Sequence, residues 1–242
     1  MTQNSLVSKK GIADIVFLID CTGSMKPCLS ALAGNIGRLL ETMVTPGANA
    51  AAVVSDWRAK VCGYRDAIAD GGLWWSESPF TSDPAQVRSA LAALEPKGGG
   101  DEPESLLDAL WKLARMPVAE KGAAAEGGTW RHRHDAVRCI IVFTDASTHM
   151  STAIPEADGA TSEDVIREVL NAKFKLFIFC PEAECYHVLQ SIDGVEMDFV
   201  GSLTDAREQM QAFSEDQENF RKVMEELGRS ITVASQVDVV TV

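Results

Sequence analysis

A short apolar segment that runs directly into polar residues is the feature that most constrains the fold of this chain. Residues 14–25 have the sequence Asp-Ile-Val-Phe-Leu-Ile-Asp-Cys-Thr-Gly-Ser-Met. An apolar run of this length, rich in Ile, Val and Phe, predicts a strand that is buried on both faces, as strands are in parallel sheets. Ligands of open parallel sheets bind beyond the carboxyl ends of the strands, so the polar residues after Ile19 lie where a binding site is expected.

Similar apolar runs recur along the chain and alternate with segments of helical periodicity. Further strands are predicted at 58–64, 73–75, 137–144, 174–180 and 196–200. Apolar residues at three- and four-residue steps predict helices at 26–45, 84–95, 106–113, 161–170, 188–192 and 214–228. This alternation predicts an α/β fold, with a doubly wound, mostly parallel central sheet flanked by helices in a Rossmann-like arrangement.

The domain organisation predicted from the sequence is simple. No break in composition and no internal repeat divides the 242 residues. We therefore expect one domain over residues 13–230, preceded by a lead-in, 1–12. Residues 231–242 are rich in Val, Ile and Thr and predict a β-prone tail, which would pair with an edge strand of this chain or of a partner.

The charge balance argues against two classes of partner. The formal net charge is −13, with 35 acidic and 22 basic side chains. Surfaces that bind the nucleic-acid backbone are basic, and anionic membranes repel an acidic protein. We therefore expect neither nucleic acid nor membrane as a partner.

The cysteines and the amino-terminal residues indicate the cellular compartment in which the protein is expected. Most of the six cysteines lie within or beside apolar runs, and no Cys-x-x-Cys pair occurs, so free core thiols are expected. The first residues lack a basic region followed by an apolar core, and no apolar run reaches the length of a membrane span. These features predict a cytoplasmic protein.

Three aspartates stand at the points where a metal site would form. Asp20 and Asp145 directly follow apolar runs, and Asp101 follows the three glycines 98–100. Thr22 and Ser24 alternate with Asp20, a spacing that can turn three oxygens to one side of a loop. Oxygen donors without sulfur or imidazole suit Mg²⁺, or Mn²⁺ or Ca²⁺. The alternative for the glycine segment is a flexible loop before a well-capped helix.

The pattern Asp20-x-Thr22-x-Ser24 resembles the first motif of von Willebrand factor A (vWA) domains, which forms their metal-ion-dependent adhesion site (MIDAS). The segment 143–146, Phe-Thr-Asp-Ala, resembles the third motif of that site. The segments 63–66, 79–83 and 98–104 are similar to a microbial type of vWA domain found beside alpha-kinases. The resemblance spans roughly residues 13–228 and implies the fold, the metal and the type of function.

The resemblance also implies the role of each site residue. Thr22 and Ser24 would bind the cation directly, and Asp20 and Asp145 would bind it directly or through water. Asp101 takes the place where many family members have a threonine. A carboxylate there would bind the cation more tightly but would weaken its attraction for an acidic partner.

The function implied is a metal-dependent protein–protein interaction module in intracellular signalling or complex assembly. Its partner would be a protein, with a kinase, a phosphatase and an ATPase as the expected classes. Two alternatives stay open: a Mg²⁺-dependent phosphohydrolase that uses Asp20, and a structural domain with an inactive metal site. Dehalogenase-type phosphatases need a second acid two residues after the nucleophile, where this chain has Thr22, so we expect that the protein is not an enzyme.

Overall fold

In the part of the chain that the structure describes, six strands form one sheet in the order β3-β2-β1-β4-β5-β6, and every neighbouring pair is parallel except β2 and β3. The computed structural model describes residues 11–45, 54–98 and 102–236. The strands are β1 (Ile12–Asp20), β2 (Asp56–Tyr64), β3 (Trp75–Glu77), β4 (Val137–Phe143), β5 (Phe174–Glu182) and β6 (Val195–Ser202). The predicted α/β fold with a mostly parallel sheet is therefore confirmed.

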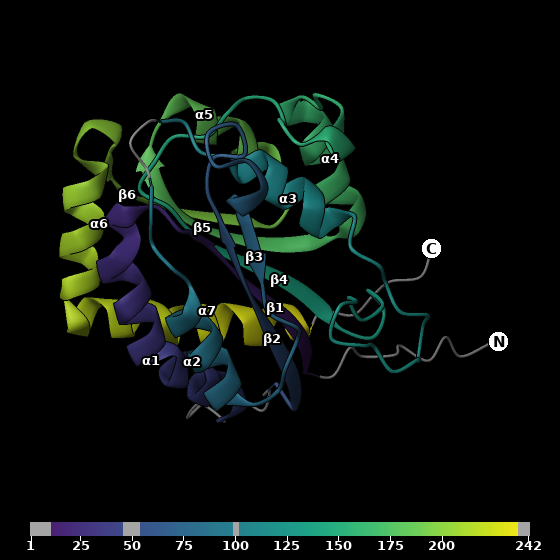
Figure 1. Ribbon diagram of the computed structural model, residues 1–242. Helices are drawn as coiled ribbons and strands as arrows, with labels where there is room; N and C mark the ends of the chain where they lie inside the picture. Colours follow the sequence, from purple (N-terminus) through teal and green to yellow (C-terminus); the bar gives the residue numbers. More distant parts are fainter. Residues whose placement is uncertain (1–10, 46–53, 99–101, 237–242) are drawn as a thin grey trace.

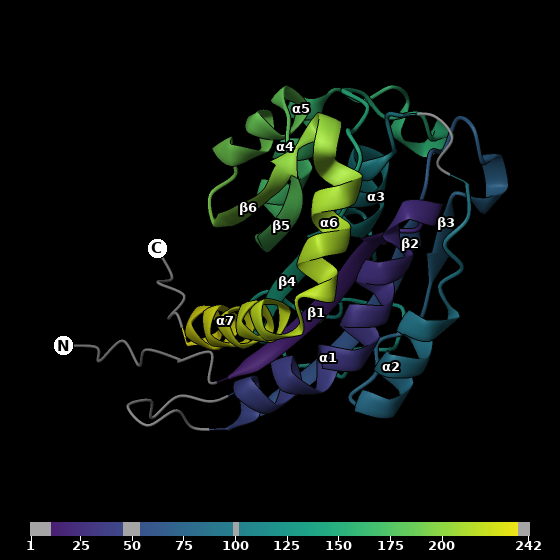
Figure 2. The same cartoon turned by 90° about the vertical axis from the view of Figure 1, so that its left-hand side faces the viewer.

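The central strands are buried on both faces because helices cover both sides of the sheet. Within the described residues, seven α-helices lie on the two sides of the sheet: α1 (Lys26–Val44), α2 (Pro84–Ala93), α3 (Leu106–Ala114), α4 (Ser162–Ala172), α5 (Glu184–His187), α6 (Ala206–Glu215) and α7 (Gln217–Ser235). Figures 1 and 2 show α1, α2, α6 and α7 on one face and α3, α4 and α5 on the other. Each face holds its own apolar core.

Helix α1 shows how the sequence produces these layers. Pro27 stands in its first turn, where a missing amide hydrogen costs nothing. The predicted apolar stripe is fully or almost fully buried against the sheet and comprises Leu29, Leu32, Ile36, Leu39, Leu40 and Met43. The helix returns the chain from the end of β1 toward the start of β2, and the two strands pair in parallel.

Three predicted elements differ from the structure. The edge strand expected at 73–75 lies at Trp75–Glu77, after a 3₁₀ turn at Gly71–Leu73. The helix expected at 188–192 is a 3₁₀ turn, Val188–Ser191, that follows α5. The helix expected at 214–228 is α7, which begins at Gln217 and continues to Ser235, and α6 before it was not predicted.

The β-prone tail is wrong for residues 231–235, which belong to α7. Ile231 is completely buried and continues the stripe formed by Phe220, Met224 and Leu227. Packing of this stripe outweighs the β propensity of the residues around it, since helical stability in proteins comes mainly from tertiary contacts. Residues 237–242, the rest of the predicted tail, lie outside the described residues.

Candidate functional site

The candidate site lies where β1 and β4 end side by side. From β1 the chain proceeds to β2 on one side, and from β4 it proceeds to β5 on the other side. The loops after these two strands therefore diverge and leave a crevice, which is the usual ligand position in open α/β sheets. Ile19 is in register with Phe143, so Asp20 and Thr144 follow at the same level of the sheet.

The loop after β1 is fixed by its own hydrogen bonds. Asp20 is completely buried, and its Oδ1 accepts a hydrogen bond of 2.8 Å from the Thr22 amide. The Met25 amide donates to the Thr22 carbonyl at 3.1 Å, which closes a tight turn before α1. This turn brings the Thr22 and Ser24 hydroxyls to within 3.2 Å of each other.

The loop after β4 completes the cluster. Ser24 Oγ donates to Asp145 Oδ1 at 3.0 Å, and Thr144 Oγ1 donates to Asp20 Oδ2 at 2.8 Å. The structure thus brings together four of the five residues expected to hold a metal: Asp20, Thr22, Ser24 and Asp145. The fifth, Asp101, lies outside the described residues.

The two carboxylates of the cluster lie in an unfavourable environment for negative charge. Burial, and then the charge of Asp145, raise the pKa of Asp20 to about 7. Burial also raises the pKa of Asp145. Asp145 Oδ2 is buried and has no hydrogen-bond partner among the described residues. A cation held here would offset both the burial of the carboxylates and their mutual repulsion.

The spacing of the oxygen atoms fits a small divalent cation. In an octahedral shell with metal–oxygen distances of about 2.1 Å, neighbouring ligand oxygens lie about 3.0 Å apart. The distances from Ser24 Oγ to Thr22 Oγ1 and to Asp145 Oδ1, 3.2 and 3.0 Å, match that spacing. Within the described ranges, no three His, Cys, Asp or Glu side chains form a metal-binding cluster, so hydroxyl groups would have to take part.

The residues on both sides of the glycine segment contact the loops after β1 and β4. Lys97 N donates to Cys21 O at 3.0 Å, and Gly23 N donates to Gly98 O at 3.3 Å. Gly98 has φ of +77°, a conformation that glycine adopts without strain. Beyond residues 99–101, Glu102 accepts a hydrogen bond of 3.1 Å from Ser147 Oγ in the loop after β4. Both flanks of this segment therefore contact loops that carry site residues.

Sequence reasoning missed two polar residues near the strand ends. Thr144, which donates to Asp20, belongs to the Phe-Thr-Asp-Ala segment but had no predicted role. Asp66, at the end of the Gly-Tyr-Arg-Asp segment, joins neighbouring loops: it accepts from Ile68 N at 3.0 Å and Ser105 Oγ at 3.3 Å, and its Oδ1 lies 3.0 Å from His149 Nε2. The signal in the sequence was position, because Thr144 directly follows β4 and Asp66 lies two residues after β2.

Comparison with known proteins establishes the fold. No protein-family model and no curated protein sequence matches the chain. Among solved structures, proximal thread matrix protein 1 (PTMP1) from the mussel byssus, with a zinc-occupied MIDAS motif, matches with a TM-score of 0.50 over 88% of this chain, at 14% identity. The fold is that of a vWA-type domain. A second crystal form of PTMP1 gives a TM-score of 0.48 at 14% identity over 90% of this chain.

The chain spans about half the length of these structures, 50% and 47%. The likeness confirms the fold implied by the sequence motifs, whereas the expected kinship with domains found beside alpha-kinases stays a prediction. Across the described part of the chain, no helix combines the length and apolar character needed to cross a membrane.

Proposed function

We propose that this domain binds one divalent cation at the carboxyl ends of β1 and β4 and docks a protein partner with that face. The observation that carries the proposal is the buried pair Asp20 and Asp145, connected to the hydroxyls of Thr22 and Ser24 at ligand-like spacing. PTMP1, which has a similar fold, was solved with zinc in its MIDAS motif. This precedent supports a divalent cation at the corresponding end of the sheet.

Each residue has a role in this proposal. Thr22 and Ser24 hold the cation through their hydroxyls, and Asp145 holds it through the carboxylate that now accepts from Ser24. Asp20 balances the charge directly or through water, while Thr144 fixes its orientation. Asp101 completes the shell from the glycine segment.

The chemistry of the site favours Mg²⁺ or Mn²⁺. All the donors are oxygen atoms, the ligand type that these hard cations prefer. Zinc, as in PTMP1, is the alternative. When bound, the cation supplies a positive centre that an acidic side chain or a shape-matched loop of the partner can approach. We propose a kinase, phosphatase or ATPase as the class of partner.

The test is a calorimetric titration of the metal-free protein with Mg²⁺ and with Mn²⁺. We expect one site in the wild type and no binding when Asp20→Ala and Ser24→Ala are combined. A matched control combines Asp193→Ala and Ser191→Ala, which remove the same two residue types from an exposed turn before β6. Equal affinities in the wild type and in the Asp20/Ser24 variant would refute the assignment, provided both are folded by circular dichroism.

We further propose that the domain is not a phosphohydrolase. The described side-chain partner of Asp20 is the Thr144 hydroxyl, and the position two residues after Asp20 carries a threonine instead of the acid needed to protonate a leaving group. Purified protein with Mg²⁺ and p-nitrophenyl phosphate or ATP should show no more turnover than the Asp20→Ala variant. Turnover that depends on Asp20 would favour the enzyme instead.

The cysteines support a reducing compartment such as the cytoplasm as the place of action. All six are free, and five of them are buried. Burial raises the pKa of Cys28 to about 12, so this thiol stays protonated at neutral pH.

A further inference from the structure

A second feature with the properties of a binding site lies away from the candidate metal site. It is a pocket of about 560 Å³ between the carboxyl-terminal half of α3 and the strands β2 and β3. None of Asp20, Thr22, Ser24 or Asp145 lines it. Its volume lies within the range typical of small-molecule sites, about 300–1,000 Å³. The proposed metal-dependent docking does not involve this pocket.

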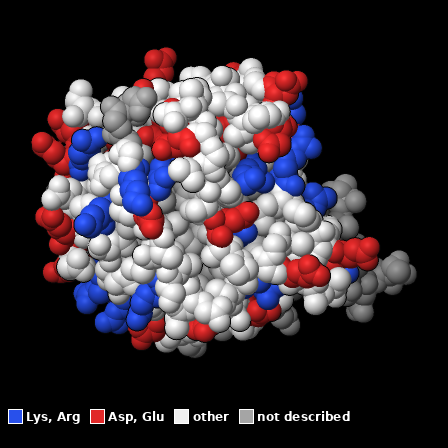
Figure 3. Space-filling view, in the orientation of Figure 1, with Lys and Arg blue, Asp and Glu red and all other residues white. Residues whose placement is uncertain are grey.

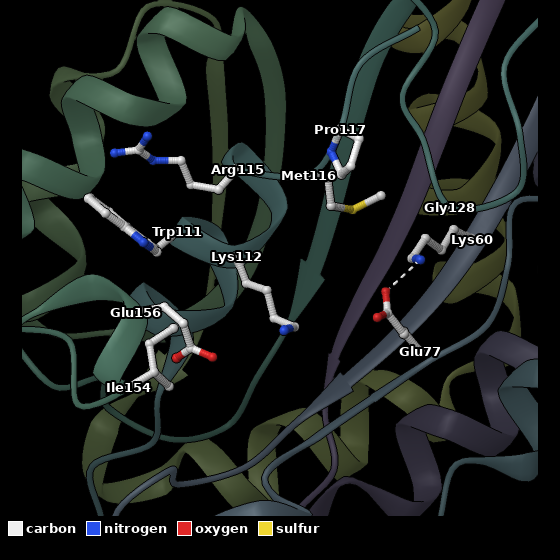
Figure 4. Close-up of a pocket in the computed structure, with 10 residues that line it drawn as sticks. All are labelled: Lys60, Glu77, Trp111, Lys112, Arg115, Met116, Pro117, Gly128, Ile154 and Glu156. Atoms are coloured by element: carbon white, nitrogen blue, oxygen red, sulfur yellow. Dashed lines mark ion pairs between the residues drawn. The ribbon is translucent and has the colours of Figure 1, made fainter.

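Positive charge is in excess on one wall of the pocket. Lys60 is buried and forms an ion pair of 2.5 Å with Glu77. Lys112, on α3, extends its ammonium group into the space between α3 and this pair (Figure 4). No carboxylate of the described residues lies within 4 Å of that ammonium group, which is 5.7 Å from the centre of the Trp75 ring. Glu77 thus compensates Lys60, whereas no ion pair with a described residue compensates Lys112.

This local charge contrasts with the whole chain, whose net charge is −13. Figure 3 shows basic side chains grouped over the region of α3, on a face that also carries acidic residues. A half-buried ammonium group without a carboxylate partner favours an anion, because the surrounding protein screens the attraction less than water does. The charge on this wall of the pocket therefore favours a ligand that carries one negative group.

The pocket lining also has apolar parts. They include the side chains of Trp111, Met116 and Ile154 (Figure 4). The Arg115 guanidinium lies 4.9 Å from the centre of the Trp111 ring and pairs with Glu168 at 3.2 Å, so its charge is already compensated. Glu156 also lines the pocket and would repel a ligand with many negative charges. An aromatic body with a single anionic group meets both conditions.

We propose that this pocket binds a small aromatic anion, with its carboxylate or phosphate at Lys112 and its ring against Trp111 and Met116. Lys60 is compensated by Glu77, so Lys112 supplies the attraction for the anionic group. This binding does not require the metal.

The experiment uses the full chain in metal-free buffer with three probes: phenyl phosphate, benzoate and the neutral benzamide. Calorimetry measures affinity, and the indole N–H resonances of the five tryptophans locate the site, with Trp111→Phe identifying the relevant signal. We expect at least one of the two anions to bind about tenfold more tightly than benzamide, a difference of about 1.4 kcal/mol, and to shift the Trp111 resonance. Which anion binds more tightly identifies the preferred group.

Three variants isolate the role of Lys112. Lys112→Met should lose the roughly tenfold advantage of the anion over benzamide, whereas Lys112→Arg should retain most of it. Lys222→Met is the matched control, since it removes an exposed lysine from α7 on the other face of the sheet. Anions that bind no better than benzamide, full affinity in Lys112→Met, or an unmoved Trp111 signal would each overturn the proposal.

Discussion

Asp20 is a buried acid whose hydrogen bonds only partly offset its burial. One carboxylate oxygen accepts from the Thr22 amide and the other from the Thr144 hydroxyl, yet the pKa is raised to about 7. Between about pH 4 and pH 7 the folded, metal-free protein therefore holds a proton that the unfolded chain releases. Asp20 thus makes a contribution to folding stability that decreases as the pH rises through this window.

The variant Asp20→Asn should remove this dependence. In metal-free buffer the free energy of unfolding of the variant, relative to that of the wild type, should increase as the pH rises from about 4 to about 7. The full pKa change corresponds to a gain on the order of 4 kcal/mol at most. Urea unfolding of both proteins at several pH values measures it. If the free energies of unfolding of the two proteins changed with pH in the same way, Asp20 would be ionised in the folded state.

The residues of the candidate site were partly predictable. Asp20, Thr22, Ser24 and Asp145 could be found because they directly follow strands, and strand ends in a parallel sheet converge. The structure brings these four together, although whether they bind metal is still a prediction. Asp66 was not predictable, because its role comes from contacts with Ser105 and His149, 39 and 83 residues away in the sequence.

Among the elements, the strands and most helices were predictable from periodicity, because buried strands and amphipathic helices differ in the spacing of apolar residues. Helix α6 was not. Its fully buried residues are Ala206, Met210 and Ser214, and only Met210 and the partly buried Phe213 are large and apolar, which is too few to give a clear period. The carboxyl-terminal part of α7 was predicted as β-structure because local propensity favoured strand, whereas contacts with the rest of the core decide the outcome.

The packing of α7 on α1 depends on Gly228. A Cβ atom at this position would lie 2.9 Å from Thr42 Cβ and 3.1 Å from the Leu39 carbonyl oxygen. We expect Gly228→Ala to destabilise the protein by about 1–3 kcal/mol, although alanine favours a helix by about 1 kcal/mol over glycine. Chemical denaturation measures the change.

A control for helix propensity is Gly34→Ala on α1, where no atom lies within 4 Å of the added Cβ. This variant should be as stable as the wild type or more stable. If Gly228→Ala were as stable as the wild type, α1 and α7 would have to move apart at no cost in free energy, contrary to their close packing.

At the scale of the whole molecule, a bound cation should stabilise the fold because it binds the folded chain and not the unfolded one. At a free metal concentration of 100 times the dissociation constant, the gain is about 2.7 kcal/mol. For a domain of this size that corresponds to a rise of about 5–10 °C in the melting temperature. Thermal unfolding with and without Mg²⁺ measures it.

Ionic strength must be matched with NaCl in this experiment, because the net charge of −13 makes general screening stabilising as well. The combined Asp20→Ala and Ser24→Ala variant separates the two effects. An equal rise in its melting temperature would mean that Mg²⁺ acts through screening alone.

The hydrogen bonds that join Thr22, Ser24 and Asp145 also have a consequence for the rate of metal capture. These oxygen atoms already lie within 3.2 Å of their neighbours, in loops held by backbone hydrogen bonds. No rearrangement of these loops has to precede binding, so the observed rate of association should rise in proportion to metal concentration. For Mg²⁺, which releases its own water reluctantly, the slow step then belongs to the ion and not to the protein.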